Sequence, residues 1–132
     1  MQVRVLLTGE SIAATPWPLP SAVRGTAGAW VEFRGIVRGQ EQGHDIPGLF
    51  YEAYAPMAEK LIRQIAEEIG RQNGCLALCI IHRLGWIPVG ETAVYVGVAA
   101  PHRREAFSAV IAFMDRLKEI VPIWKLGASE PS

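Results

Sequence analysis

The stretch TAVYVGVAAPHRREAFSAVIAFMDRLKEIVPIWK, residues 92–125, sets the architecture of this chain. Its first part, residues 92–100, is rich in β-branched and small side chains and predicts a strand. From Pro101 apolar residues recur at helical spacing, and the helix should end near Ile120 because Pro122 disfavours helical backbone at the residue before it. The predicted inner stripe of this helix is Ala106, Phe107, Val110, Ile111, Met114 and Leu117.

Strands are also predicted on the N-terminal side of this stretch. Residues 2–8 form a first predicted strand. Apolar and polar side chains alternate over residues 28–38, which predicts a strand ending in Arg38, and residues 49–54 predict another. The polar residues 39–45 between them predict a mobile loop, through which we expect these two strands to pair.

A second helix is predicted in the middle of the chain. Pro56 suits the first turn of a helix, and Gly70 and Gly74 are expected to stop it. The apolar run 75–82 that follows predicts a strand, and residues 86–90 predict a turn. The apolar positions at helical spacing are Met57, Leu61, Ile62, Ile65 and Ile69.

These elements predict the α+β class, because strands outnumber helices and no internal repeat or glycine-rich phosphate loop is present. At 132 residues we expect a single domain, residues 1–132. The 13 basic residues balance the 13 acidic ones, so no overall field favours nucleic acid or an anionic membrane as a partner. No signal peptide pattern opens the sequence and no apolar run approaches the roughly 20 residues of a membrane span, so we expect a cytoplasmic location.

The two cysteines, Cys75 and Cys79, lie in the apolar run CLALCII. A strand would turn both to the same face, and no nearby cysteine or histidine completes a metal site. Buried free thiols are favoured over a metal-binding or redox role, and no metal or cofactor is predicted.

Five basic residues form a candidate cationic constellation: Arg38, His102, Arg103, Lys118 and Lys125. Taken singly, each has a plain explanation, because charged side chains usually serve solvation and Lys118 also complements a helix dipole. The pair His102 and Arg103 is more informative. Cations are unfavourable at a helix N-terminus unless an anion binds there.

The spacing of Arg103 and Lys118 adds a geometric constraint. They are separated by fifteen positions on one predicted helix, hence by about 22 Å along its axis, and cannot grip one small ligand together. If both belong to one site, a second copy of the helix must complete it. The hypothesis is a site shared across a dimer interface.

With these residues in place, the chain resembles the large, catalytic subunit of molybdopterin synthase. The resemblance covers about three quarters of the chain, in many separate blocks that keep the family's order and spacing. The blocks are Gly28-Ala29, Phe33-Arg34-Gly35-Ile36-Val37-Arg38, Gly43, Tyr51-Glu52-Ala53-Tyr54, Met57-Ala58, His82-Arg83-Leu84-Gly85, Val89-Gly90-Glu91, Pro101-His102-Arg103, Ala106-Phe107, Arg116-Leu117-Lys118-Glu119 and Val121-Pro122-Ile123-Trp124-Lys125.

The resemblance implies an α/β hammerhead-like domain with a mostly antiparallel sheet and two main helices, which dimerises. Each copy would bind a small ubiquitin-like sulfur-carrier subunit, giving a heterotetramer. The carrier's C-terminal Gly-Gly tail, charged as a thiocarboxylate, would donate sulfur to cyclic pyranopterin monophosphate and so build the dithiolene of molybdopterin. Neither nucleic acid nor membrane is implied as a partner.

The resemblance also implies roles for residues. Lys118 and Lys125 match the family's two active-site lysines: Lys118 would act in acid/base catalysis and stabilise an oxyanion, with partial burial lowering its pKa, and Lys125 would stabilise charge near the carrier terminus. Phe33 and Met114 match pocket-lining positions, for which a core role is equally plausible. The implied substrate-binding set is Ile36, Val37, Arg38, His102, Arg103, Lys118 and Lys125.

One departure leaves an alternative open. After Lys125 the family continues with a second lysine and a glutamate, whereas Leu126 and Gly127 follow here. The alternative function is a non-catalytic homologue that binds the carrier but has lost turnover. A plain anion-binding or nucleotide-binding domain is a third hypothesis, which lacks a phosphate-loop motif.

Overall fold

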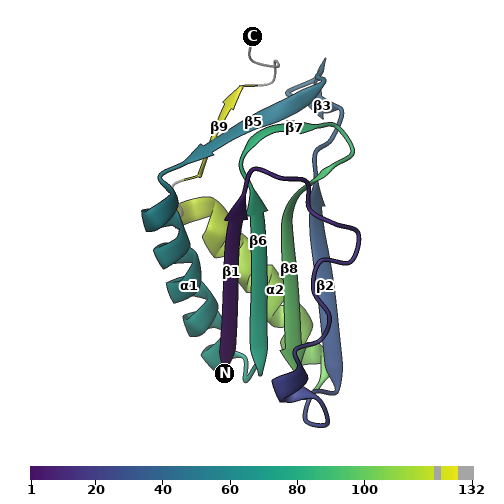
Figure 1. The fold of residues 1–132 in the computed structure, drawn as a ribbon, viewed down its shortest axis with the longest axis vertical. Helices are drawn as coiled ribbons and strands as arrows, with labels where there is room; N and C mark the ends of the chain where they lie inside the picture. The colour runs from purple at the N-terminus through teal and green to yellow at the C-terminus, as the bar shows by residue number, and fades with distance from the viewer. Residues whose placement is uncertain (121–122, 128–132) are drawn as a thin grey trace.

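The computed structural model describes residues 1–120 and 123–127. Its main sheet has the strand order β1-β6-β8-β2 (Figure 1). Strands β1 and β6 pair in parallel, whereas β8 is antiparallel to both of its neighbours. The strands are β1 Gln2–Thr8, β6 Ala77–Arg83, β8 Thr92–Ala100 and β2 Ala29–Ile36.

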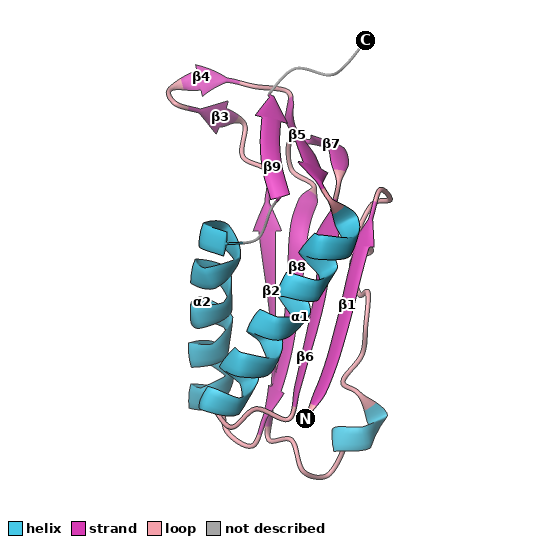
Figure 2. Cartoon of the chain, turned by 90° about the vertical axis from the view of Figure 1, so that its left-hand side faces the viewer, coloured by secondary structure: helices cyan, strands magenta, loops and turns pink. Residues whose placement is uncertain are grey.

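Two helices, α1 Ala55–Gln72 and α2 Arg103–Ile120, cover one face of this sheet, as Figure 2 shows. The predicted α+β class, with a mostly antiparallel sheet and two main helices, is confirmed for the described part of the chain. Neither helix is long and apolar enough to cross a membrane, over the residues described. The core between helices and sheet includes Ile62, Ile65, Leu78, Ile80, Val96, Val98 and Phe113.

A smaller sheet in the order β7-β5-β9 lies beyond one end of the main sheet (Figure 1). Its strands are β7 Gly85–Pro88, β5 Gly48–Ala53 and β9 Ile123–Gly127. The expectation that residues 86–90 form only a turn is wrong, because residues 85–88 pair with β5. Strand β9 was not predicted.

The predicted pairing of residues 28–38 with residues 49–54 is also wrong. Strand β2 pairs with β8, while β5 pairs with β7 and β9. The reason lies between them, where β3 (Gln40–Glu41) and β4 (His44–Asp45) form a hairpin of their own. Its two central residues, Gln42 and Gly43, have φ of 51° and 80°, as a tight two-residue hairpin turn requires. The predicted mobile loop is therefore a folded hairpin.

Strand and helix ends differ from the prediction at three places. Strand β2 ends at Ile36, so Arg38 lies beyond it rather than at its end. Gly70 lies inside α1, where a Cβ would meet the side chain of Met1, the residue before β1, and the helix continues to Gln72. Helix α2 begins at Arg103 rather than at Pro101.

The predicted inner stripe of α2 is partly wrong. Phe107 and Ile111 are 54% and 65% exposed, whereas Ala109 and Phe113 are fully buried. The buried face of α2 therefore includes Ala109 and Phe113, and the apolar pair Phe107 and Ile111 faces outward.

On the opposite face of the main sheet, residues 9–28 run across β8 and β2 (Figure 1). Arg34 donates hydrogen bonds to the carbonyl oxygens of Ala13 and Ala14, and Trp17 packs edge-on against Tyr95 with ring centroids 6.3 Å apart. This segment thus packs on the sheet, and it contains a short 3-10 helix, Ser21–Val23.

Candidate functional site

A cavity of about 480 Å³ lies where the ends of β2 and β6 meet β5 and the last turns of α2. Residues far apart in the sequence meet here, because the small sheet folds back over the end of the main sheet. Its lining residues are Phe33, Gly35, Ile36, Val37, Arg38, Gln40, Glu41, Leu49, Tyr51, His82, Ala93, Val94, Met114, Leu117, Lys118 and Ile123.

The floor of the cavity is one cross-strand row of the main sheet. His82 of β6 pairs with Val94 of β8, which pairs with Gly35 of β2, and all three line the cavity. Gly35 contributes no side chain. A Cβ built there would lie 2.7 Å from Val94 Cγ1, so the strand can approach this closely only as glycine.

The wall of the cavity comes from α2 and from the segment after β2. Met114, Leu117 and Lys118 lie three and four residues apart, which places them on one helix face. Val37 is buried and is fixed by two backbone hydrogen bonds: it donates to the Glu91 carbonyl and accepts from the Gly90 amide. This anchoring holds the start of the segment that carries Arg38.

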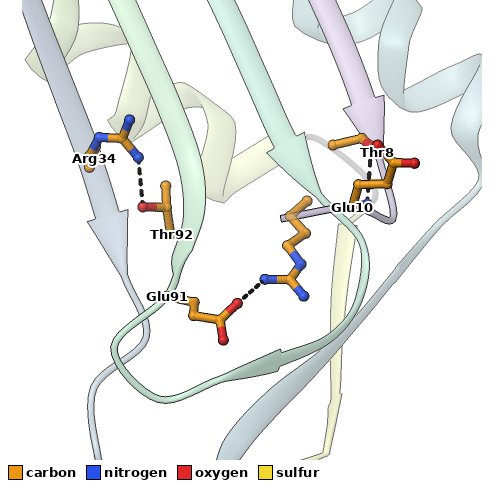
Figure 3. Close-up of polar contacts among 6 residues, drawn as sticks. Thr8, Glu10, Arg34, Glu91 and Thr92 are labelled. Atoms are coloured by element: carbon orange, nitrogen blue, oxygen red, sulfur yellow. Dashed lines mark hydrogen bonds and ion pairs between the residues drawn. The ribbon is translucent and has the colours of Figure 1, made fainter. Parts of the chain in front are cut away.

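Glu91 is itself held in place by Arg83. Arg83 Nη1 donates to Glu91 Oε1 at 2.6 Å, and the Arg83 side chain is only 10% exposed (Figure 3). A second contact braces the neighbouring strands, because Arg34 Nη1 donates to Thr92 Oγ1 at 2.9 Å. The outer end of the sheet, which frames the cavity, is thus tied together by charged and polar side chains.

Six of the predicted site residues line this cavity: Phe33, Ile36, Val37, Arg38, Met114 and Lys118. Arg38 and Lys118 are exposed, so they supply positive charge at its rim. The partial burial expected for Lys118 is therefore not provided by this chain alone. Lys125 lies on β9, where the backbone register sets it opposite Tyr51, another lining residue.

His102 and Arg103 do not line the cavity; they lie at the opposite end of α2 from Lys118. The His102 side chain is 81% exposed, and its Nδ1 lies 3.4 Å from Glu105 Oε2. The same carboxylate oxygen accepts a hydrogen bond from the His102 backbone N–H at 3.0 Å. The predicted separation of Arg103 from Lys118 along one helix is confirmed.

His82 lines the cavity but was not predicted as a site residue. It is 6% exposed, and its Nδ1 lies 2.8 Å from the Arg83 carbonyl oxygen. Burial lowers the pKa of its imidazole, and the backbone hydrogen bond opposes this shift only in part. The signal in the sequence was a polar residue at the inward position of an otherwise apolar strand.

The two cysteines are buried free thiols, as predicted. Burial raises the pKa of both Cys75 and Cys79 to about 11, which keeps them protonated at neutral pH. They do not share a face, contrary to expectation: Cys75 precedes β6 and joins the core under the helices, whereas Cys79 lies against residues 17–24 on the other face. Within the described residues no group of histidine, cysteine and carboxylate side chains could hold a metal ion.

The geometry is that of an α+β protein with a half-open cavity at one end of its main sheet, with Arg38 and Lys118 at its rim and His82, Val94 and Gly35 in its floor. Such a cavity suits an anionic ligand with an apolar body. The chain belongs to the MoaE protein family, since a sequence model of that family matches residues 11–120.

The chain is similar to named members of this family. It is 45% identical over 98 residues to the molybdopterin synthase catalytic subunit of Staphylococcus carnosus, an alignment that covers 74% of this chain and 65% of that relative. This chain thus spans just under two thirds of the relative's length. The corresponding Staphylococcus aureus subunit is 44% identical over 98 residues, covering 74% of this chain and 66% of the relative.

Solved structures share the fold. The crystal structure of molybdopterin synthase from Staphylococcus aureus superposes with a TM-score of 0.79 at 36% identity, covering 92% of this chain and 87% of the other. A complex of subunits 1 and 2 of the molybdopterin-converting factor from Helicobacter pylori gives a TM-score of 0.67, covering 98% and 93%. At 20% identity the second likeness supports the fold alone.

Proposed function

We propose that this chain is a molybdopterin synthase catalytic subunit. It transfers sulfur from the C-terminal thiocarboxylate of a small ubiquitin-like carrier to cyclic pyranopterin monophosphate, and two such transfers make the dithiolene. The observation that carries this proposal is the cavity of a MoaE family member, in which Phe33 and Arg38 from one stretch of sequence meet Met114 and Lys118 from another. We propose that this work is done in the cytoplasm.

The charge of the cavity rim fits this chemistry. A thiocarboxylate is an anion, the acceptor carries a cyclic phosphate, and sulfur transfer through an acyl link passes through an oxyanion. The guanidinium of Arg38 serves binding, while Lys118 stabilises the oxyanion and exchanges protons. Lys125 supplies further positive charge near the carrier terminus. Ile36 and Val37 shape the pocket beside Arg38.

The carrier enters as a separate subunit in this proposal. The solved Helicobacter pylori assembly is a complex of two molybdopterin-converting factor subunits, which is the kind of assembly proposed here. The cavity is half open and about 480 Å³, enough for a Gly-Gly tail together with part of a small substrate.

A second copy of the chain completes the site in this proposal. His102 and Arg103 lie too far along α2 to reach the cavity of their own chain. The exposed pair Phe107 and Ile111 lies one and two turns into the same helix and offers an apolar contact for another copy. Such a dimer would bring Arg103 of one copy to Lys118 of the other and would bury that lysine further.

The experiment that tests the function supplies the chain with a thiocarboxylated carrier and cyclic pyranopterin monophosphate and measures molybdopterin. We expect product, and we expect Lys118→Ala to lower kcat by about 100-fold or more while changing substrate affinity little, because it removes charge stabilisation in the transition state. Lys60→Ala, at an exposed position of α1 away from the cavity, is the matched control and should match the wild type.

Two results would count against the proposal. Carrier binding without product in the wild type would select the alternative of a non-catalytic carrier-binding homologue. Near-normal turnover in Lys118→Ala would remove that residue from its assigned role.

A further inference from the structure

His82 projects into the cavity because of its position in β6. Side chains alternate along a strand, so His82 shares a face with Leu78 and Ile80, which are fully buried in the core under the helices. His82 is the next residue after Ile80 on this face, and there it lines the cavity together with Val94. A titratable side chain thus occupies the floor of the pocket in an otherwise apolar row.

The tautomer of His82 follows from its one hydrogen bond. A carbonyl oxygen can only accept, so Nδ1, 2.8 Å from the Arg83 oxygen, carries the proton. In the neutral ring Nε2 then bears the lone pair. Nε2 has no hydrogen-bond partner in the described part of the chain, and the ring edge packs against Tyr51 with centroids 5.6 Å apart.

The free nitrogen keeps contact with solvent. Among the buried side-chain nitrogens and oxygens of residues 1–120 and 123–127, only Arg83 Nε lacks both a partner and solvent contact. His82 Nε2 has no hydrogen-bond partner, yet it is not one of the atoms that are shut off from solvent, so solvent reaches it. The solvent-filled space that His82 lines is the cavity.

Charged groups of both signs share the cavity with His82. Arg38 and Lys118 place positive charge around the same cavity, and Glu41 and Tyr51 also line it. On its own strand the neighbouring arginine side chain, that of Arg83, is paired with Glu91. Burial lowers the pKa of His82 below its ordinary value of 6.5, so the neutral form of the ring dominates at physiological pH.

We propose that His82 Nε2 is the proton acceptor for the water that releases the carrier from its acyl link to the substrate. This inference rests on the proposed function. Water adds to the acyl carbon and gives a proton to Nε2; the new C–O bond forms as the acyl C–S bond breaks. The sulfur leaves on the substrate as a thiolate and the carrier leaves as a carboxylate, its second proton passing to solvent. No redox partner is needed.

The role fits the division of labour in the cavity. Arg38 and Lys118 are cations suited to hold anions, whereas a base that accepts a proton from water must be neutral beforehand. His82 meets that requirement through its burial and its fixed tautomer.

The test follows a single turnover of the full chain with thiocarboxylated carrier and cyclic pyranopterin monophosphate, and reads the carrier by intact mass. His82→Asn keeps an amide near Nδ1 and removes the base. We expect the acyl conjugate of carrier and substrate to accumulate and to decay about 100-fold or more slower than in the wild type. Ile81→Val, a buried neighbour on the opposite face of β6, is the control and should release carrier at the wild-type rate.

The decay rate should also depend on pH in the wild type. A base must be unprotonated, so the rate is level above the pKa of His82 and falls as the pH drops through it, below 6.5. In His82→Asn this decline should disappear. If the Asn variant does not fold, as judged by loss of carrier binding, His82→Gln takes its place. The pH dependence of the wild-type decay rate then still tests the role of His82.

Each outcome has one meaning. A wild type that makes no molybdopterin overturns the proposed function. A wild type that makes it, beside folded His82 variants that release the carrier equally fast without conjugate, overturns only the role of His82. Wild-type decay that does not slow as the pH is lowered below 6.5 does the same.

Discussion

Gly35 shows how one residue shapes the cavity. It lies in the floor between Phe33 and the end of β2, and its missing side chain lets Val94 pack directly against the strand. The same absence leaves room in the cavity above. Glycine inside a strand usually weakens it, so its presence here reflects a close approach rather than strand propensity.

Gly35→Ala should therefore destabilise the fold. The added Cβ would meet Val94 Cγ1 at 2.7 Å, and we expect a loss of about 1–3 kcal/mol in the free energy of unfolding, measured by urea denaturation. Gly9→Ala is the control, because nothing lies within 4 Å of its Cβ. Gly35→Ala combined with Val94→Ala should lose less than the two changes summed. Equal stability of the two glycine variants would show that the close approach is not a constraint.

At the scale of residues, the sequence predicted the charged rim better than the floor. Arg38 and Lys118 were found because cations in matching motifs stand out, and both line the cavity. His82 was missed because a single histidine in an apolar run is indistinguishable from a core residue until the sheet's end is placed. Lys125 is located only by its backbone, and its role stays a prediction.

At the scale of elements, strands were predicted well and their partners poorly. The bounds of β1 and β8 agree with the prediction, because β-branched side chains mark them locally. Pairing depends on turn geometry, and the tight turn at Gln42-Gly43 closes a hairpin that separates β2 from β5. The alternation of apolar residues along a strand does not indicate which other strand it pairs with.

The orientation of α2 illustrates a second limit. Phe107 and Ile111 are as apolar as Val110 and Phe113, so the sequence shows a wide apolar arc without indicating its inner part. A helix that also contacts another chain has a wider apolar arc than its own core requires. The error in the predicted stripe thus marks the exposed surface that the proposed dimer would use.

The pair Arg83–Glu91 stabilises the junction of β6 with the turn before β8. Glu91→Gln would leave the buried Arg83 charge without its counter-charge, and we expect a loss of about 1–3 kcal/mol in the free energy of unfolding. Glu67→Gln is the control: its partner Arg71 is 74% exposed and 4.0 Å away, so the loss should stay under about 0.5 kcal/mol. Urea denaturation compares the two, and equal losses would contradict the structural role of the junction.

At the scale of the whole molecule, two groups of cations lie at opposite ends of α2. Lys118 is at the cavity, and His102 with Arg103 is at the far end of the helix. One chain cannot unite them, since about 22 Å of helix lies between. A dimer related by a two-fold axis would unite both ends twice, giving two equivalent sites.

Mixing two inactive variants tests this arrangement. Arg103→Ala and Lys118→Ala should each lack activity alone, whereas a one-to-one mixture of exchanged dimers should recover about a quarter of wild-type activity, because half the dimers then carry one intact site of two. Adding Ile111→Asp to both chains places charge in the exposed apolar pair and should abolish the recovery. Mixed dimers that form, as shown by native mass spectrometry, yet stay inactive would contradict a shared site.

The position of β9 has a consequence for biosynthesis. This strand pairs with β5, and Ile123 at its start closes one side of the cavity, yet it leaves the ribosome after every other described element. A nascent chain can therefore bury its main core before its pocket is closed. Until β9 docks, the cavity lacks the side that Ile123 closes, although its other lining residues are already joined to the rest of the fold.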